Sequence, residues 1–203
     1  MHPTVLVFDF DGVLADTESL HWRSWAEVLA RHGESFTWEE YCQVGRGLRD
    51  EQMVMNLHRL DPGVRDVLHR SIAERQAMVR RWCQTESPIS LATAQMIRGL
   101  TAWRLGLVTS SDRADVEPLL QAAGIHKCFA ALVYGGETHR TKPDPEPYLL
   151  IRERLEADAG FALEDSDAGM QSATAAGFTA IRVHSPAELP VLVTNLLGSL
   201  SDR

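Results

Sequence analysis

Short apolar runs recur along the chain, and most of them lead directly into polar residues. The first is Val5-Leu6-Val7-Phe8, which is followed by Asp9. Uninterrupted apolar runs of this length are typical of strands that are buried on both faces of a parallel sheet. The sequence predicts further strands of this kind at 105–108, 131–134, 161–163 and 179–183.

Helical patterns fill the segments between the later strands. Helices are expected near 92–102, 114–123, 145–157 and 169–176, with a last short helix after Ser185. Strands that alternate with helices indicate an α/β fold, in which right-handed crossovers build a parallel sheet. We therefore expect a parallel sheet core with helices on both faces.

The stretch between the first two strands has a different pattern. It predicts helices near 17–31, 50–58 and 64–82, and Thr37-Trp38-Glu39-Glu40 matches a capping box that starts another helix. We interpret residues 16–88 as an inserted α-helical cap, and residues 1–15 and 89–203 as the catalytic core. The insertion comes where it can cover the carboxyl edge of the sheet.

Length, charge and cysteine content narrow the class of protein. The 203 residues suffice for one domain and a small inserted one. The net charge of −8 argues against nucleic acid as a partner. No apolar run approaches the roughly 18 residues of a membrane span, and no signal-peptide pattern opens the chain, so we expect a cytoplasmic protein. The three cysteines predict neither a disulfide framework nor a zinc site.

Acidic, basic and hydroxyl side chains follow four of the predicted strands. Asp9 and Asp11 follow the first, Thr109-Ser110-Ser111 the second, Lys142 the third and Glu164-Asp165 the fourth. Ligands of open α/β sheets bind at the carboxyl ends of the strands. The sequence therefore predicts that these groups share one pocket, and together they are the groups that a phosphoryl transfer needs.

The paired acids suggest how such a reaction would run. A divalent cation between a carboxylate and a phosphate oxygen reduces the repulsion between two anions, and Mg²⁺ prefers oxygen ligands. Asp9 would attack phosphorus and form an aspartyl-phosphate. Asp11 would act as general acid and then as base for the incoming water. By itself, an Asp-x-Asp sequence would equally suit a capped turn.

Each remaining group has one role in such a pocket and an ordinary role outside it. Thr109 and Ser110 could hold phosphate oxygens at a helix N-terminus, or they could cap that helix. Lys142, one of only two lysines, could offset the charge of Asp9 and the phosphoryl group, or it could lie in solvent. Glu164-Asp165 could complete the metal site or cap a turn. A shared pocket accounts for all of them at once.

These segments resemble the haloacid dehalogenase superfamily in order and spacing, over nearly the whole chain. Residues 9–18 look like its first motif, Thr109 falls at the second, Lys142 at the third and 164–169 at the fourth. The resemblance implies a Rossmann-like core, a mobile cap and Mg²⁺-dependent phosphoryl transfer. The roles it implies are nucleophile and metal ligand for Asp9, acid/base and backbone metal ligand for Asp11, phosphate binding for Thr109, the Ser110 backbone and Lys142, and metal binding for Asp165 and Glu164.

Within the superfamily, the insertion is similar to the cap of the β-phosphoglucomutase and phosphoglycolate phosphatase branch. Arg49 falls where that branch has a cap residue that meets the substrate, and His21 is a second candidate contact. An exposed arginine at a helix start would explain Arg49 as well. No lysine occurs between residues 1 and 126. This argues against mutase and phosphonate chemistry, since both would use a cap lysine, and Asp11 argues against halide chemistry.

The sequence thus predicts a Mg²⁺-dependent phosphatase that hydrolyses a small phosphorylated metabolite. We expect no nucleic-acid or membrane partner, and a monomer or weak homodimer. The alternative is a sugar-phosphate mutase of the β-phosphoglucomutase type. A phosphate-binding protein without turnover is a further hypothesis, against which the intact acidic set argues. The sequence leaves the substrate open.

Overall fold

The computed structural model describes residues 5–46, 50–158 and 160–201. The chain divides into two compact units, one made of Met1–Asp16 and Ser87–Arg203, the other of Thr17–Glu86. We call them the sheet unit and the helical unit, and each is described by itself. Within the described ranges, no helix has the length and apolar character needed to cross a membrane.

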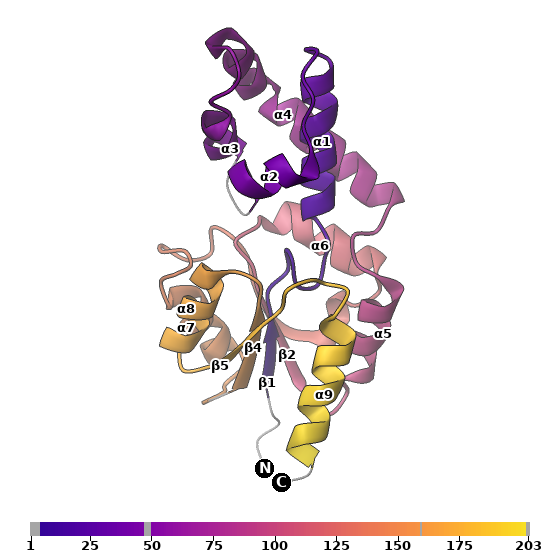
Figure 1. Cartoon of the computed structure of the whole chain (residues 1–203). Coiled ribbons are helices and arrows are strands. Elements are labelled where there is room, and N and C mark those ends of the chain that lie inside the picture. The colour runs from indigo at the N-terminus through magenta and orange to yellow at the C-terminus, as the bar shows by residue number, and fades with distance from the viewer. Residues whose placement is uncertain (1–4, 47–49, 159, 202–203) are drawn as a thin grey trace. The chain divides into compact units, whose positions relative to one another are not determined.

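The sheet unit is built on five parallel strands in the order β3-β2-β1-β4-β5 (Figure 1). Their bounds are Val5–Phe8 for β1, Arg104–Val108 for β2, Phe129–Val133 for β3, Gly160–Glu164 for β4 and Thr179–Arg182 for β5. This confirms the predicted α/β fold. β3 begins two residues earlier than the sequence suggested, because Phe129 pairs with Leu105 next to a shift in register. With all strands parallel, their carboxyl ends meet at one edge.

Helices cover both faces of this sheet (Figure 1). One face packs against α5 (Leu91–Gly99), α6 (Arg113–Ala122) and α9 (Leu189–Ser201), and the other against α7 (Glu146–Arg154) and α8 (Asp167–Ala175). A short 3₁₀ helix, His126–Cys128, precedes β3.

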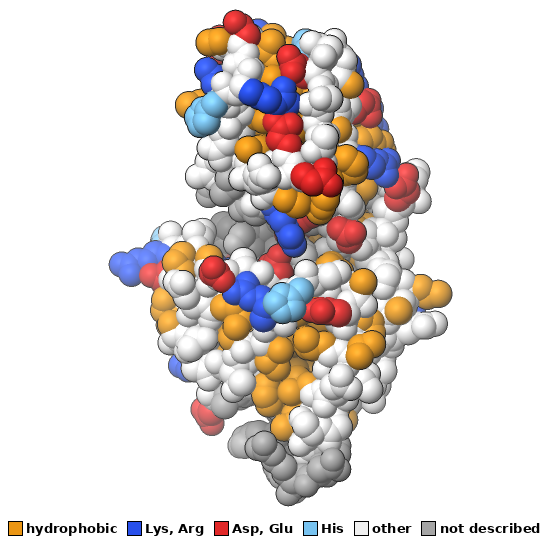
Figure 2. Space-filling model, viewed as in Figure 1, with side chains coloured by type: hydrophobic (Ala, Val, Ile, Leu, Met, Phe, Trp, Pro, Cys, Tyr) orange, Lys and Arg blue, Asp and Glu red, His pale blue; other side chains and the backbone are white. Residues whose placement is uncertain are grey.

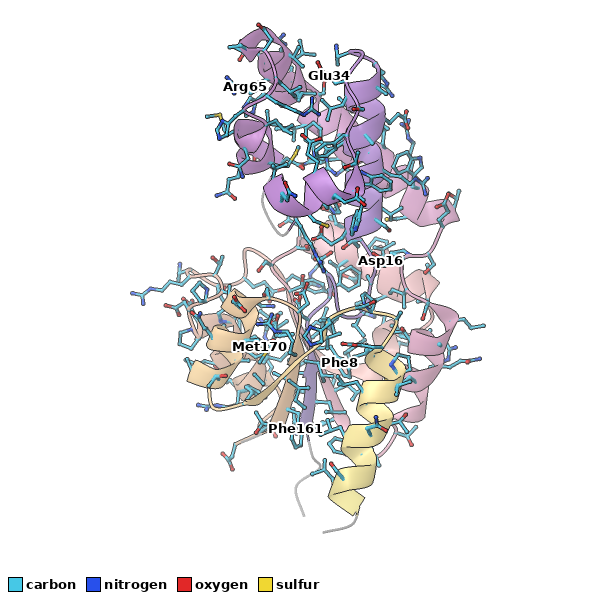
Figure 3. All side chains as sticks on the ribbon, viewed as in Figure 1. Phe8, Asp16, Glu34, Arg65, Phe161 and Met170 are labelled. Atoms are coloured by element: carbon cyan, nitrogen blue, oxygen red, sulfur yellow. The ribbon has the colours of Figure 1, made fainter. Side chains whose placement is uncertain are left out.

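Alternate side chains of β1 go to the two faces, as the pleat of a strand requires. Leu6 and Phe8 enter the core beneath α5, α6 and α9, whereas Val5 and Val7 enter the core beneath α7 and α8. Figure 3 labels Phe8 on β1 and Phe161 on the neighbouring β4; Phe8 belongs to the first of these cores, and Phe161 packs against it. The central strand is therefore buried on both sides, and this explains its uninterrupted apolar sequence.

The helical unit consists, in its described part, of α1 (Glu18–Ala30), α2 (Trp38–Val44), α3 (Asp50–Asn56) and α4 (Pro62–Thr85). Its own apolar core includes Trp25, Leu29, Met53, Leu57 and Leu68. Charged side chains of both signs are interspersed on its surface in Figure 2, and the exposed ion pairs of Arg31 and Arg59 belong to it.

The predicted capping box forms in one direction. Thr37 caps α2, since its hydroxyl accepts a hydrogen bond from the backbone N–H of Glu40 at 3.2 Å. The carboxylate of Glu40 instead accepts a hydrogen bond from Arg59 at 2.5 Å. The side chain of Glu40, which in a full capping box would bind the backbone N–H of the N-cap residue, therefore pairs with Arg59.

Candidate active site

The register of β1 and β4 brings three acids together at the carboxyl edge of the sheet. Phe8 pairs with Leu163, so Asp9 lies beside Glu164, and the backbone N–H of Asp9 donates to the carbonyl of Leu163 at 3.0 Å. Carboxylate oxygens of Asp9, Glu164 and Asp165 lie within 4.8 Å of one another. Asp9 and Glu164 are buried, at 7% and 0% exposure.

Lys142 bridges this acidic cluster. It lies in the loop between β3 and α7, and its Nζ donates to Asp9 Oδ1 at 2.8 Å and to Glu164 Oε1 at 2.6 Å. A third hydrogen bond, 3.0 Å long, joins Nζ to the backbone carbonyl of Val108, the last residue of β2. The lysine predicted as a charge partner is therefore held by three strands and lies away from solvent.

Burial sets the electrostatics of the cluster. Desolvation raises the pKa of the Asp9 carboxyl well above its ordinary value, while the charge of Lys142 acts in the opposite direction. Burial alone would lower the pKa of Lys142, but the carboxylates of Asp9 and Glu164 hold it above its ordinary value. The carboxylate oxygens of Asp9, Glu164 and Asp165 converge at one point. A donor set made only of oxygens suits Mg²⁺.

One oxygen of the cluster has no hydrogen-bond partner among the described residues. Glu164 Oε2 is buried and accepts no hydrogen bond from any described residue. Such an atom is costly unless a partner binds it. The convergence of three carboxylates and this orphaned oxygen both fit a cation site.

Gly12 and Gly169 make room for the carboxylates. A Cβ on Gly12 would lie 2.1 Å from Asp165 Oδ2, and a Cβ on Gly169 would lie 1.9 Å from Glu164 Oε2. Gly12 also has a φ of +73°, a conformation that favours glycine. Both glycines lie just beyond the predicted acids in sequence, where any side chain would occupy the space of a carboxylate.

The loop after β2 lies against Asp11. Ser111 Oγ donates to Asp11 Oδ2 at 2.6 Å, and Thr109 Oγ1 accepts a hydrogen bond from the backbone N–H of Ser111 at 3.0 Å. Thr109 is buried, whereas Ser110 is exposed on the same loop. The acid predicted to transfer protons is therefore joined to the segment predicted to hold phosphate, while the proposed roles of Thr109 and Ser110 remain predictions.

The predicted cap contacts belong to the helical unit. Arg49 lies outside the described residues. His21, on α1, accepts a hydrogen bond at Nδ1 from Arg75 Nη1 at 3.1 Å. Arg75 itself is 2% exposed and pairs with Asp50 at 2.7 Å. Arg75 is therefore an internal residue of this unit, and substrate contact by Arg49 and His21 stays a prediction.

Two further side chains contact the acids: Ser111, which the sequence placed in the shared pocket without a role of its own, and Tyr148, which sequence reasoning missed. Tyr148 OH donates to Glu164 Oε1 at 2.6 Å from the first turn of α7. The sequence holds no signal for it, because a buried aromatic residue at this position of an amphipathic helix would suit the apolar core. Ser111 had a weak signal, as the third polar residue after a strand, but nothing distinguished it from Ser110.

The chain is similar to known proteins in sequence and in fold. The sequence model of the haloacid dehalogenase-like hydrolase family matches residues 6–183. The phosphorylated carbohydrates phosphatase of Thermotoga maritima is 28% identical, covering 89% of this chain and 85% of that protein. The fructose-1-phosphate phosphatase YqaB of Escherichia coli is 29% identical, covering 88% and 95%. The structure of CbbY from Rhodobacter sphaeroides in complex with xylulose-1,5-bisphosphate has a TM-score of 0.66 at 26% identity, covering 90% and 86%.

Proposed function

The chain belongs to the haloacid dehalogenase-like hydrolase family, and from this premise we propose that it is a Mg²⁺-dependent phosphatase acting on small phosphorylated sugars. The observation that carries the proposal is the bridge from Lys142 to Asp9 and Glu164, at 2.8 and 2.6 Å, inside a buried cluster of acids. Buried ionisable groups that perturb one another in this way are typical of functional sites.

Asp9, Glu164 and Asp165 would hold the metal, together with the backbone carbonyl of Asp11. When bound, Mg²⁺ would supply positive charge between these carboxylates and the oxygens of a phosphate group. Lys142 offsets the remaining negative charge, so that an anionic substrate can approach an anionic nucleophile.

The reaction then follows from the chain's own side chains. A carboxylate oxygen of Asp9 forms a bond to phosphorus as the bond from phosphorus to the ester oxygen breaks, and Asp11 gives its proton to that departing oxygen. In the second step, Asp11 takes a proton from water, the water oxygen attacks phosphorus, and the bond to Asp9 breaks. Phosphate leaves, and both acids return to their starting state. Thr109 and the Ser110 backbone would hold the phosphate oxygens.

The names of the relatives support sugar phosphates as the substrate class. One relative is named for phosphorylated carbohydrates, another for fructose 1-phosphate, and the CbbY structure contains a sugar bisphosphate. We assign the discrimination between sugars to the helical unit, acting as a cap through residues such as Arg49 and His21. A cap that closes over the substrate would also exclude water.

The first test is hydrolysis of an aryl phosphate and of a panel of sugar phosphates, with and without Mg²⁺. We expect phosphate release that depends on Mg²⁺, and its loss in Asp9→Asn, since the amide cannot attack phosphorus. The matched control is Asp66→Asn, an exposed acid of α4, which should keep full activity. Undiminished turnover by Asp9→Asn would overturn the assignment of the nucleophile. If the protein isomerised a sugar phosphate without net release of phosphate, the proposed hydrolase would instead be a mutase.

A further inference from the structure

Tyr148 is a buried core residue that carries one polar side-chain atom, its phenol oxygen. It is fully buried, at 0% exposure, and its ring packs edge-on against Phe178 with 5.6 Å between the ring centroids. Lys142 Nζ lies over the same ring, 5.5 Å from its centroid. A phenylalanine would fill this space equally well. The hydroxyl therefore serves no packing purpose, and its single described contact is Glu164.

The two oxygens of Glu164 have opposite surroundings. Oε1 accepts hydrogen bonds from Tyr148 OH and from Lys142 Nζ, each 2.6 Å long. Oε2 is buried beside Gly169 and accepts none from any described residue. A carboxylate left to itself would turn to share its donors between both oxygens, because an unpaired buried oxygen is costly. Two donors fixed on one oxygen prevent this rotation.

The hydroxyl is suited to act as a donor. A carboxylate oxygen can only accept, so the phenol O–H of Tyr148 is the donor in its hydrogen bond to Glu164. Tyr148 lies on α7, and Phe178 and Lys142 contact its ring. The hydrogen bond to Glu164 therefore comes from a rigid element, whereas the long side chain of Lys142 also serves Asp9.

We propose that Tyr148 is a positioning residue for the metal site, which holds the Glu164 carboxylate in the orientation that binds the cation. The inference rests on the proposed function for the identity of the cation. Its physical content is narrower: removal of one hydroxyl, with all packing kept, weakens the binding of a divalent cation. Partners of this kind, one shell out from a metal, typically change metal affinity by about 10–100-fold when they are removed.

The test is the affinity of the purified, metal-free protein for Mg²⁺, measured by isothermal titration calorimetry without substrate. Tyr148→Phe should raise the dissociation constant about tenfold or more. In the hydrolysis assay, the same variant should need more Mg²⁺ for half-maximal rate, while kcat at saturating Mg²⁺ changes much less. A merely structural role would not produce this difference between the two quantities.

The matched control is Tyr41→Phe in the helical unit. Tyr41 is also buried, and its hydroxyl donates to a glutamate, Glu18, at 2.5 Å. Its removal deletes the same kind of hydrogen bond from a place outside the acidic cluster, and it should leave the Mg²⁺ affinity unchanged.

The outcomes separate this inference from the proposed function. Tighter or equal Mg²⁺ binding by Tyr148→Phe, with normal binding by the unmodified protein, overturns the role of Tyr148 and leaves the phosphatase proposal intact. Weaker binding by Tyr148→Phe, in a protein that hydrolyses no phosphate ester, supports the role of Tyr148 and overturns the phosphatase proposal. An unmodified protein that binds no Mg²⁺ overturns the metal site, and both proposals with it.

Discussion

At the scale of single residues, the site depends on a glycine, because a side chain at that position would occupy the space of a carboxylate. Glu164 can keep its buried orientation only because Gly169, in the first turn of α8, has no side chain. The helix cap depends on the same residue, since the backbone N–H of Gly169 donates to Ser166 Oγ at 3.0 Å. One glycine thus joins the start of a helix to the carboxylate that precedes it.

We predict that Gly169→Ala lowers kcat/KM for Mg²⁺-dependent hydrolysis by about 100-fold or more, since displacement of a reacting group by about 1 Å can have this effect. The added Cβ would lie 1.9 Å from Glu164 Oε2, and the carboxylate would have to move. The measurement is kcat/KM with an aryl phosphate, together with Mg²⁺ affinity by calorimetry.

The control for this substitution is Gly198→Ala, a helical glycine of α9 whose Cβ would meet no atom within 4 Å. It should keep full activity and raise the free energy of unfolding by roughly 0.5–1 kcal/mol, because alanine loses less conformational entropy in a helix. Equal activity of the two variants would show that Glu164 can move without harm.

The identities of the acids and of Lys142 could be predicted from sequence because strand ends in a parallel sheet meet at one edge. Their orientations could not. Which oxygen of Glu164 receives two donors, and that Ser111 rather than Ser110 contacts Asp11, depends on side-chain rotamers that a linear pattern does not determine.

At the scale of elements, the helical unit contains a buried ion pair that ties three helices together. Arg75 on α4 donates to Asp50 at the start of α3 and to Ser24 on α1, and its guanidinium lies over the ring of Trp25. Trp25 Nε1 and Gln76 Nε2 also donate to Asp50. Loss of one partner from such a network leaves a charge in a place that water scarcely reaches.

We predict that Arg75→Met lowers the free energy of unfolding of the protein by about 3 kcal/mol, the low end for a broken buried pair, because Asp50 keeps two other donors. The comparison is Arg31→Met, which removes the exposed pairs with Glu27 and Glu74 and should lower the free energy of unfolding much less, because water screens exposed pairs. Urea unfolding of both variants measures the difference. Equal losses would mean that burial adds nothing to the Arg75 pair.

The positions of the helices and strands along the chain were largely predictable from the sequence. Which elements lie next to one another in the fold was not. Apolar periodicity located the helices and strands within a few residues, since each must bury one face or both. The strand order β3-β2-β1-β4-β5 and the inward direction of Arg75 depend on contacts between distant segments. In the sequence, Arg75 looks like any other charged residue of a polar helix.

At the scale of the whole molecule, the chain leaves the sheet unit and returns to it at almost the same point. The backbone N–H of Asp16, labelled in Figure 3, donates to the carbonyl of Pro88 at 2.9 Å. The 70 residues Thr17–Glu86 therefore form an insertion whose two ends are already joined by a hydrogen bond. The acids of the candidate site, Lys142 and Tyr148 all lie in the sheet unit, which has two apolar cores of its own.

This arrangement predicts that the sheet unit can fold and bind metal without the insertion. If Thr17–Glu86 is replaced by about four Gly and Ser residues, the linker has little distance to span, and a short loop costs little entropy to close. We expect a cooperative thermal transition and Mg²⁺ affinity close to that of the full chain. Hydrolysis of an aryl phosphate should persist, whereas discrimination among sugar phosphates, which we assign to the helical unit, should disappear. A folded sheet unit that binds no Mg²⁺ would mean that the insertion supplies a ligand. If the shortened protein kept full selectivity, the residues that select the sugar would have to lie on the sheet unit itself.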